Sequence, residues 1–294
     1  MSGGAAAEDL ELLAGPWSFR ALAAGPEDGR LVLLLHGFPQ SSYQWRHQLA
    51  ALGEAGYRAV AFDQRGYSPG ARPEGVENYS IDRLVADVLA VADELNSHQI
   101  DLVGHDWGAA VAWQVAGRYP ERLRSLTALS APHGAAFRAA LASSSGDQAR
   151  RSSYIAFFQQ EGTAEETLLA EGGAGLRRLF EVSGFPYDPA PYVELLQEPG
   201  ALTAALNWYR ALVRGGAGAA MASVAMGPVT VPTLYVWSDQ DPAIGREAAE
   251  GTAEHVEGPY RFEVLAGVSH WIPEAVPDQL NRMLLDHLQS AAST

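Results

Sequence analysis

The stretch Val103–Ala110 reads VGHDWGAA and lies where two patterns of apolar residues meet. Ile100–Gly104, before the turn, is a short apolar run typical of a buried strand, and Trp107–Arg118, after it, has the character of a helix. The two glycines of the stretch stand two residues to either side of Asp106. We therefore predict a tight strand-to-helix turn that raises the Asp106 side chain above a sheet. The simpler alternative is that Asp106 only caps the helix.

Similar apolar runs recur along the chain and alternate with helical stretches. The predicted strands are Leu31–Leu35, Arg58–Phe62, Ile100–Gly104, Leu123–Leu129, Pro232–Trp237 and Tyr260–Leu265. The predicted helices are Ser42–Leu52, Ile81–Leu95 and Trp107–Arg118. Strands that are apolar on both faces and alternate with helices predict an α/β fold with a mostly parallel sheet flanked by helices.

The alternation stops between about Ala131 and Val229, where the chain is rich in Ala, Leu and Arg and has no clear strand. We expect an inserted helical cap at residues 134–228, between a first part of the α/β core at 1–133 and a second at 229–294. Two glycine clusters, Gly172–Gly175 and Gly215–Gly218, are predicted to be flexible joints within the cap.

Composition excludes several classes of function. The 294 residues suit one large domain, or a core with an inserted lobe. The 35 acidic residues outnumber 20 basic residues, all of them arginine, and a net charge of -15 argues against a nucleic-acid partner. The absence of lysine excludes a Schiff-base or P-loop lysine, and the absence of cysteine excludes thiol nucleophiles and thiolate metal sites.

Neither a signal peptide nor a membrane span is expected. The N-terminus lacks a basic segment followed by an apolar run, and the longest apolar run, Leu31–Leu35, is far shorter than the roughly 20 residues that span a bilayer. We therefore expect a cytoplasmic protein without a membrane partner. The oligomeric state stays open.

The spacing Gly-x-Asp-x-Gly around Asp106 resembles the nucleophile elbow of α/β-hydrolases, with Asp where Ser often stands. Gly-x-Ser-x-Gly occurs once, at Gly66–Gly70, but this stretch does not join a predicted strand to a predicted helix, which disfavours a serine esterase. A carboxylate that attacks an sp³ carbon forms an ester with the substrate, and an activated water must then cleave this ester. Such chemistry requires a base, an acid that orients the base, and N–H donors for the developing oxyanion.

The remaining members of such a site follow from chain order. His270 is the predicted base, because it alone of eight histidines follows a strand late in the chain. Asp241, 29 residues earlier at the end of the preceding predicted strand, is the predicted acid, with Asp239 as its rival. HGFP at 36–39 resembles the oxyanion loop of the fold, which implies the backbone N–H groups of Phe38 and Trp107 as donors.

Together these motifs resemble the soluble epoxide hydrolases, which belong to the α/β-hydrolase fold. The resemblance extends to DQRGY at 63–67, GVSHW at 267–271 and two cap segments with Tyr154 and Tyr209, of which LNWYR at 206–210 is the most discriminating. It implies hydrolysis of an epoxide to a vicinal diol through an Asp106 ester, without cofactor or metal. Two phenols suit this reaction, because the ring oxygen becomes an alkoxide that needs a proton.

Two alternatives stay open: a haloalkane or haloacid dehalogenase with the same nucleophile, and a non-catalytic ligand-binding member of the fold. A dehalogenase needs donors for the halide, and Trp107 together with Trp208 offers them in principle. We expect an apolar small-molecule substrate, because several aromatic residues lie in the predicted cap: Phe157, Phe158, Phe180 and Trp208.

Overall fold

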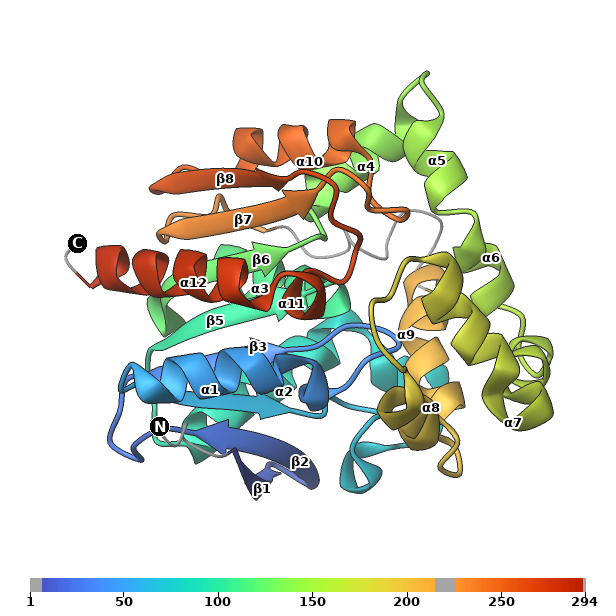
Figure 1. Cartoon of the computed structure of the whole chain (residues 1–294), viewed down its shortest axis with the longest axis horizontal. Coiled ribbons are helices and arrows are strands. Elements are labelled where there is room, and N and C mark those ends of the chain that lie inside the picture. The colour runs from blue at the N-terminus through green and yellow to red at the C-terminus, as the bar shows by residue number, and fades with distance from the viewer. Residues whose placement is uncertain (1–6, 215–225, 293–294) are drawn as a thin grey trace.

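The computed structural model describes residues 7–214 and 226–292 and contains one eight-stranded sheet (Figure 1). The strands are β1 (Glu8–Ala14), β2 (Trp17–Ala24), β3 (Leu31–Leu35), β4 (Arg58–Phe62), β5 (Ile100–His105), β6 (Leu123–Leu129), β7 (Thr233–Ser238) and β8 (Tyr260–Leu265). Their order in the sheet is β1-β2-β4-β3-β5-β6-β7-β8. The pairs from β4 to β8 are parallel, whereas β1 and β2 join the edge as antiparallel strands. The predicted α/β fold with a mostly parallel sheet is confirmed.

Helices cover both faces of this sheet. The first face of β3, with Leu33 and Leu35, packs on α2 (Ile81–Glu94) and α3 (Trp107–Arg118). The second face, with Val32 and Leu34, packs on the pair of helices that runs in front of the sheet in Figure 1. These two helices are α1 (Arg46–Glu54) and α12 (Pro277–Ala291). Burial on both faces explains why these strands are continuous apolar runs.

The β1–β2 hairpin is the part of the sheet that the sequence patterns did not predict. Its two strands, joined by a two-residue turn at Gly15–Pro16, carry alternating buried and exposed residues. One face of the hairpin is exposed, so its strands lack the uninterrupted apolar run that identifies the other strands in the sequence.

The remaining helices lie largely between β6 and β7 in sequence. They are α4 (Gly134–Ala142), α5 (Asp147–Arg151), α6 (Tyr154–Phe158), α7 (Thr163–Val182), α8 (Ala190–Leu196) and α9 (Ala201–Arg214), followed after β7 by α10 (Arg246–Gly251) and after β8 by α11 (Ile272–Ala275). We call α5–α9 the helical insertion; they lie together beyond one end of the sheet, at the right of Figure 1. Helix α4 instead packs against α10, which favours a cap boundary after α4. The predicted division into core and cap stays a prediction.

The first predicted glycine joint coincides with a kink in α7, where Ala170–Gly173 leave the helical conformation. The second, Gly215–Gly218, lies outside the described residues.

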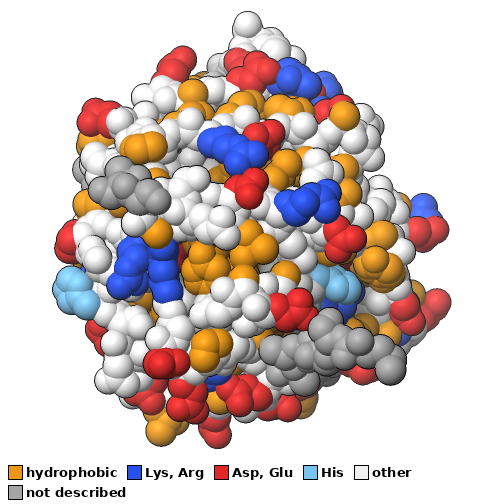
Figure 2. Space-filling view, turned by 60° about the vertical axis from the view of Figure 1, so that its left-hand side comes forward, with side chains coloured by type: hydrophobic (Ala, Val, Ile, Leu, Met, Phe, Trp, Pro, Cys, Tyr) orange, Lys and Arg blue, Asp and Glu red, His pale blue; other side chains and the backbone are white. Residues whose placement is uncertain are grey.

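Acidic and basic side chains are mixed on the face shown in Figure 2. On the face shown in Figure 2, arginines lie in small separate groups, often beside acidic side chains, rather than in a continuous basic strip. Among the helices of the described part of the chain, none has the length and apolar character needed to cross a membrane.

Candidate active site

The turn after β5 holds Asp106 in an unusual backbone conformation, with φ 53° and ψ -119°. A Cβ at Gly104 would lie 2.3 Å from Gly108 O, and a Cβ at Gly108 would lie 2.1 Å from Leu35 O. Only glycine therefore permits this approach of strand and helix. The Asp106 side chain makes no capping hydrogen bond to α3, so the simple N-cap interpretation is wrong.

The Asp106 carboxylate instead lies between a backbone donor and an imidazole. Its Oδ1 accepts a hydrogen bond from the Phe38 backbone N–H at 2.9 Å, and the nearby Trp107 backbone N–H favours the charged form of the carboxylate. Its Oδ2 lies 3.6 Å from His270 Nε2. The loop after β3 and the turn after β5 meet here because the two strands are neighbours with parallel carboxyl ends.

His270 also contacts Asp241, and the two residues follow the neighbouring strands β8 and β7. The distance from His270 Nδ1 to Asp241 Oδ2 is 2.9 Å, and both side chains are buried. The rival acid, Asp239, accepts a hydrogen bond from the backbone N–H of Gly267 instead. The structure thus brings Asp241 to the imidazole and leaves Asp239 apart.

Ser130 is a site residue that the sequence analysis missed. It follows β6 and is fully buried with φ 67°, and its hydroxyl donates to Asp241 Oδ2 at 2.5 Å and lies 2.9 Å from His270 Nδ1. The sequence signal was present, because Ser130 is the polar residue at the end of a strand predicted to lie in the same sheet as the strand before Asp241.

The charges of the site are coupled. Burial lowers the pKa of His270, but the charge and hydrogen bond of Asp241 and the charge of Asp106 outweigh it and raise the pKa to about 9. Burial raises the pKa of Asp241, yet His270, Ser130 and the Ala243 N–H outweigh it and keep this pKa below its usual value. The pKa of Asp106 is raised by burial, which exceeds the opposing effect of His270 and the two backbone donors.

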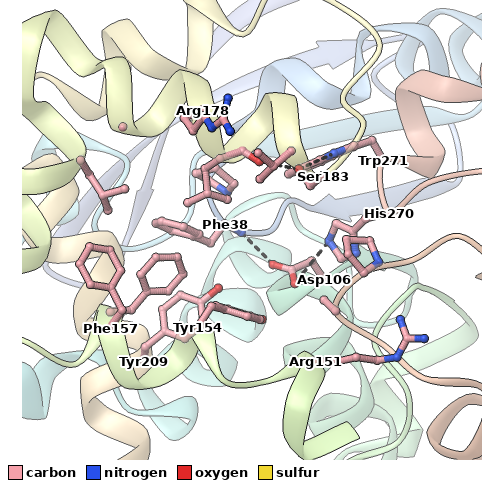
Figure 3. A pocket seen from close by; sticks show the side chains of 18 residues that line it. Phe38, Asp106, Arg151, Tyr154, Phe157, Arg178, Ser183, Tyr209, His270 and Trp271 are labelled. Carbon is pink, nitrogen blue, oxygen red and sulfur yellow. Dashed lines mark hydrogen bonds and ion pairs between the residues drawn. The ribbon is translucent and has the colours of Figure 1, made fainter. Parts of the chain in front are cut away.

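Tyr154 on α6 and Tyr209 on α9 face Asp106 across a cavity of about 430 Å³ (Figure 3). Their ring centroids lie 6.3 Å apart, and the Trp107 ring lies edge-on to Tyr209 at a centroid distance of 5.1 Å. Burial, followed by nearby charges, raises the pKa of both phenols well above the usual value. Both are therefore protonated at neutral pH and able to donate hydrogen bonds.

The rest of the cavity wall is mostly apolar. Of the cap aromatic residues that were predicted to surround the substrate, some line this cavity and others do not. Phe157 and Phe158 line it. Trp208 and Phe180 do not: the indole N–H of Trp208 donates to the backbone oxygen of Arg65 at 3.0 Å, and Phe180 packs on Trp271. Because its N–H is already bonded, Trp208 offers no free donor for a halide.

Comparison with known proteins gives a consistent result. The α/β-hydrolase fold family model matches residues 30–274. The chain is 38% identical to the AB hydrolase superfamily protein YfhM of Bacillus subtilis, over 91% of this chain and 93% of that one. It is 32% identical to epoxide hydrolase A of Mycobacterium tuberculosis, over 92% and 93% of the two chains. A crystal structure of Bacillus megaterium epoxide hydrolase bound to an inhibitor superposes with a TM-score of 0.86 at 29% identity, over 95% of this chain and all of that chain.

Proposed function

Because this chain belongs to the epoxide hydrolases of the α/β-hydrolase fold family, and is thus a hydrolase, we propose that it opens an apolar epoxide through an Asp106 ester and releases a vicinal diol. The observation that carries the proposal is the position of one carboxylate. Asp106 lies between the Phe38 backbone N–H donor and an imidazole, on the opposite side of an apolar cavity from a pair of tyrosines.

The first step is attack of Asp106 on an epoxide carbon. Oδ2 is the attacking oxygen, since Oδ1 is occupied by the Phe38 N–H. The C–O bond of the ring breaks as the new C–Oδ2 bond forms, and the ring oxygen takes the electron pair. Tyr154 and Tyr209 hydrogen-bond this oxygen, and one phenol delivers its proton.

The second step is hydrolysis of the ester. His270 takes a proton from a water that attacks the Asp106 carboxyl carbon, and Asp241 stabilises the imidazolium. The oxyanion forms on Oδ1, which already accepts the Phe38 N–H, and the N–H of Trp107 serves as its second donor. The intermediate collapses by cleavage of the C–Oδ2 bond, so Oδ2 leaves with the diol. One proton of the water passes through His270 to this oxygen, and the other restores the phenol that gave up its proton in the first step. The loss of the Asp106 charge on esterification removes one cause of the raised His270 pKa, which makes the imidazole a base when it is needed.

The test is a diol assay on a small panel of aryl and alkyl epoxides, run beside halide release from haloalkanes. We expect diol formation and no halide release. A single turnover in H₂¹⁸O with enzyme in excess should leave the new oxygen in Asp106 and an unlabelled diol. A labelled diol would exclude the ester, and halide release without diol would favour a dehalogenase.

A further inference from the structure

Helix α5 contacts the loop that carries the predicted acid. The loop, Asp241–Gly245, begins three residues after the end of β7, and α5 comes from the helical insertion about 95 residues earlier in the chain. Gly245 allows the close approach, because a Cβ there would lie 2.6 Å from Asp147 Oδ2. Two side chains of α5, Gln148 and Arg151, hydrogen-bond this loop.

Gln148 binds the loop through both ends of its amide. Its Nε2 donates to Ala243 O at 2.8 Å, and its Oε1 accepts a hydrogen bond from the Gly245 N–H at 2.9 Å. The residue is only 2% exposed. A buried amide with both ends bonded to one loop has a single orientation, and so restrains the loop in two places.

Arg151 binds the loop one turn further along α5. Its Nη1 donates to the backbone oxygen of Asp241 at 2.6 Å, and its Nε bonds Asp147 Oδ2 at 2.8 Å, which fixes the guanidinium plane. Figure 3 shows Arg151 at the cavity on the side of His270 and Asp106.

The same loop orients the Asp241 carboxylate from within. The backbone N–H groups of Ala243 and Ile244 donate to Asp241 Oδ1 at 2.8 and 3.1 Å. A shift of this loop therefore rotates the carboxylate that holds His270 Nδ1.

We infer that Gln148 and Arg151 are positioning residues that hold the acid of the water-activating pair, so that the helical insertion governs the second chemical step as well as the first. Residues 147–151 lie just before α6, which carries Tyr154. A single segment therefore contributes to ring opening through the Tyr154 phenol, and to ester hydrolysis through the loop that it holds. The inference rests on the proposed function for its chemistry, and on hydrogen bonds alone for the restraint of the loop.

The test compares Gln148→Met and Arg151→Met, which remove the hydrogen bonds at similar side-chain length, with Arg150→Met. Arg150 is the matched control, because it lies on the same helix and bonds Asp147 but not the loop. With styrene oxide in rapid-quench experiments, we expect alkylation of Asp106 to stay within about twofold, whereas ester hydrolysis slows about 10- to 100-fold. Intact-protein mass spectra should then show an accumulated adduct, and Arg151→Lys should recover part of the rate.

Hydrogen exchange of residues 241–245 provides a readout that does not depend on catalysis. We expect faster exchange at Gly245 in Gln148→Met and no change in Arg150→Met. Three results would each overturn the inference. They are unchanged hydrogen exchange at Gly245, unchanged ester hydrolysis in a variant whose loop exchanges faster, and equal slowing of alkylation and ester hydrolysis. If the unmodified protein forms neither adduct nor diol, the proposed function fails instead, while the exchange data still decide whether α5 restrains the loop.

Discussion

The Nε2 atom of His270 lies 3.6 Å from Oδ2 of Asp106, whereas Oδ1 of the same carboxylate accepts the Phe38 N–H at 2.9 Å. The two oxygens of one side chain thus have different surroundings. An ester formed at Oδ2 leaves its carbonyl oxygen at the Phe38 N–H donor, and its carboxyl carbon within reach of a water bound to the imidazole.

The first prediction concerns the nucleophile. Replacing Asp106 with Ala removes the attacking oxygen, so diol formation should fall by at least about 10³-fold. Far-UV circular dichroism should be unchanged, because the carboxylate makes no capping bond to α3. A folded Asp106→Ala protein with full activity would contradict the ester mechanism.

The second prediction separates the two steps. His270→Gln keeps the nucleophile and both tyrosines but lacks the base, so it should react with one equivalent of epoxide and then stop. Intact-protein mass spectrometry should show a stable adduct, and peptide mapping should place it on Asp106. Normal diol formation without adduct would remove His270 from its role.

The third prediction concerns the tyrosines. Tyr154→Phe or Tyr209→Phe leaves one phenol and should slow ring opening only in part, whereas the double variant should lose about 10²–10⁴-fold, the usual value of general acid catalysis. The exposed Tyr187 provides the control, since Tyr187→Phe should not change the rate. Ring opening at the unmodified rate in the double variant would show that neither phenol donates.

The fourth prediction is a titration. An NMR titration should find the His270 pKa at about 9 in the free protein, and a lower pKa in Asp106→Asn, because one of the two carboxylates that raise it is then neutral. Since the folded pKa exceeds the usual 6.5, the imidazolium stabilises the fold fully below about pH 6.5 and loses this effect as the pH rises through about 9. The free energy of unfolding of the unmodified protein should exceed that of His270→Gln at low pH. This difference should shrink as the pH rises from about 6.5 to about 9. A pKa near 6.5 would contradict the charge coupling.

The fifth prediction concerns Ser130. Ser130→Ala removes a hydrogen bond to the Asp241 carboxylate, so the pKa of Asp241 should rise and ester hydrolysis should slow about tenfold, a typical cost for one hydrogen bond to a charged group. Ser125→Ala is the control, because Ser125 on β6, the strand that Ser130 follows, donates a similar bond to Asp101, away from the site. Equal effects of the two variants on hydrolysis would show that Ser130 has no special role.

Much of the fold follows from the sequence because its strands are buried on both faces. The six predicted strands appear in the structure with ends that differ by at most one residue, and α3 has the predicted bounds. The β1–β2 hairpin was missed since one of its faces is exposed, which replaces a continuous apolar run with an alternating one.

The candidate site, like the fold, was predictable from the sequence only in part. Local glycine spacing and chain order were sufficient to nominate Asp106, His270 and Asp241. The sequence did not distinguish which of two neighbouring helix residues, Trp208 or Tyr209, contacts the cavity. Successive residues on a helix point about 100° apart, and the packing of the helix places only Tyr209 at the cavity.

Short-range patterns were sufficient to predict the parallel sheet, the turn that raises Asp106 and the order of the candidate triad, because such patterns encode strands, turns and helices. The bond from Ser130 to Asp241, and the bonds from Gln148 and Arg151 to the loop, became visible only in the folded chain. These contacts join residues 90 to 111 positions apart. No local pattern records such a contact, since it exists only after β6, β7 and the helical insertion have packed together.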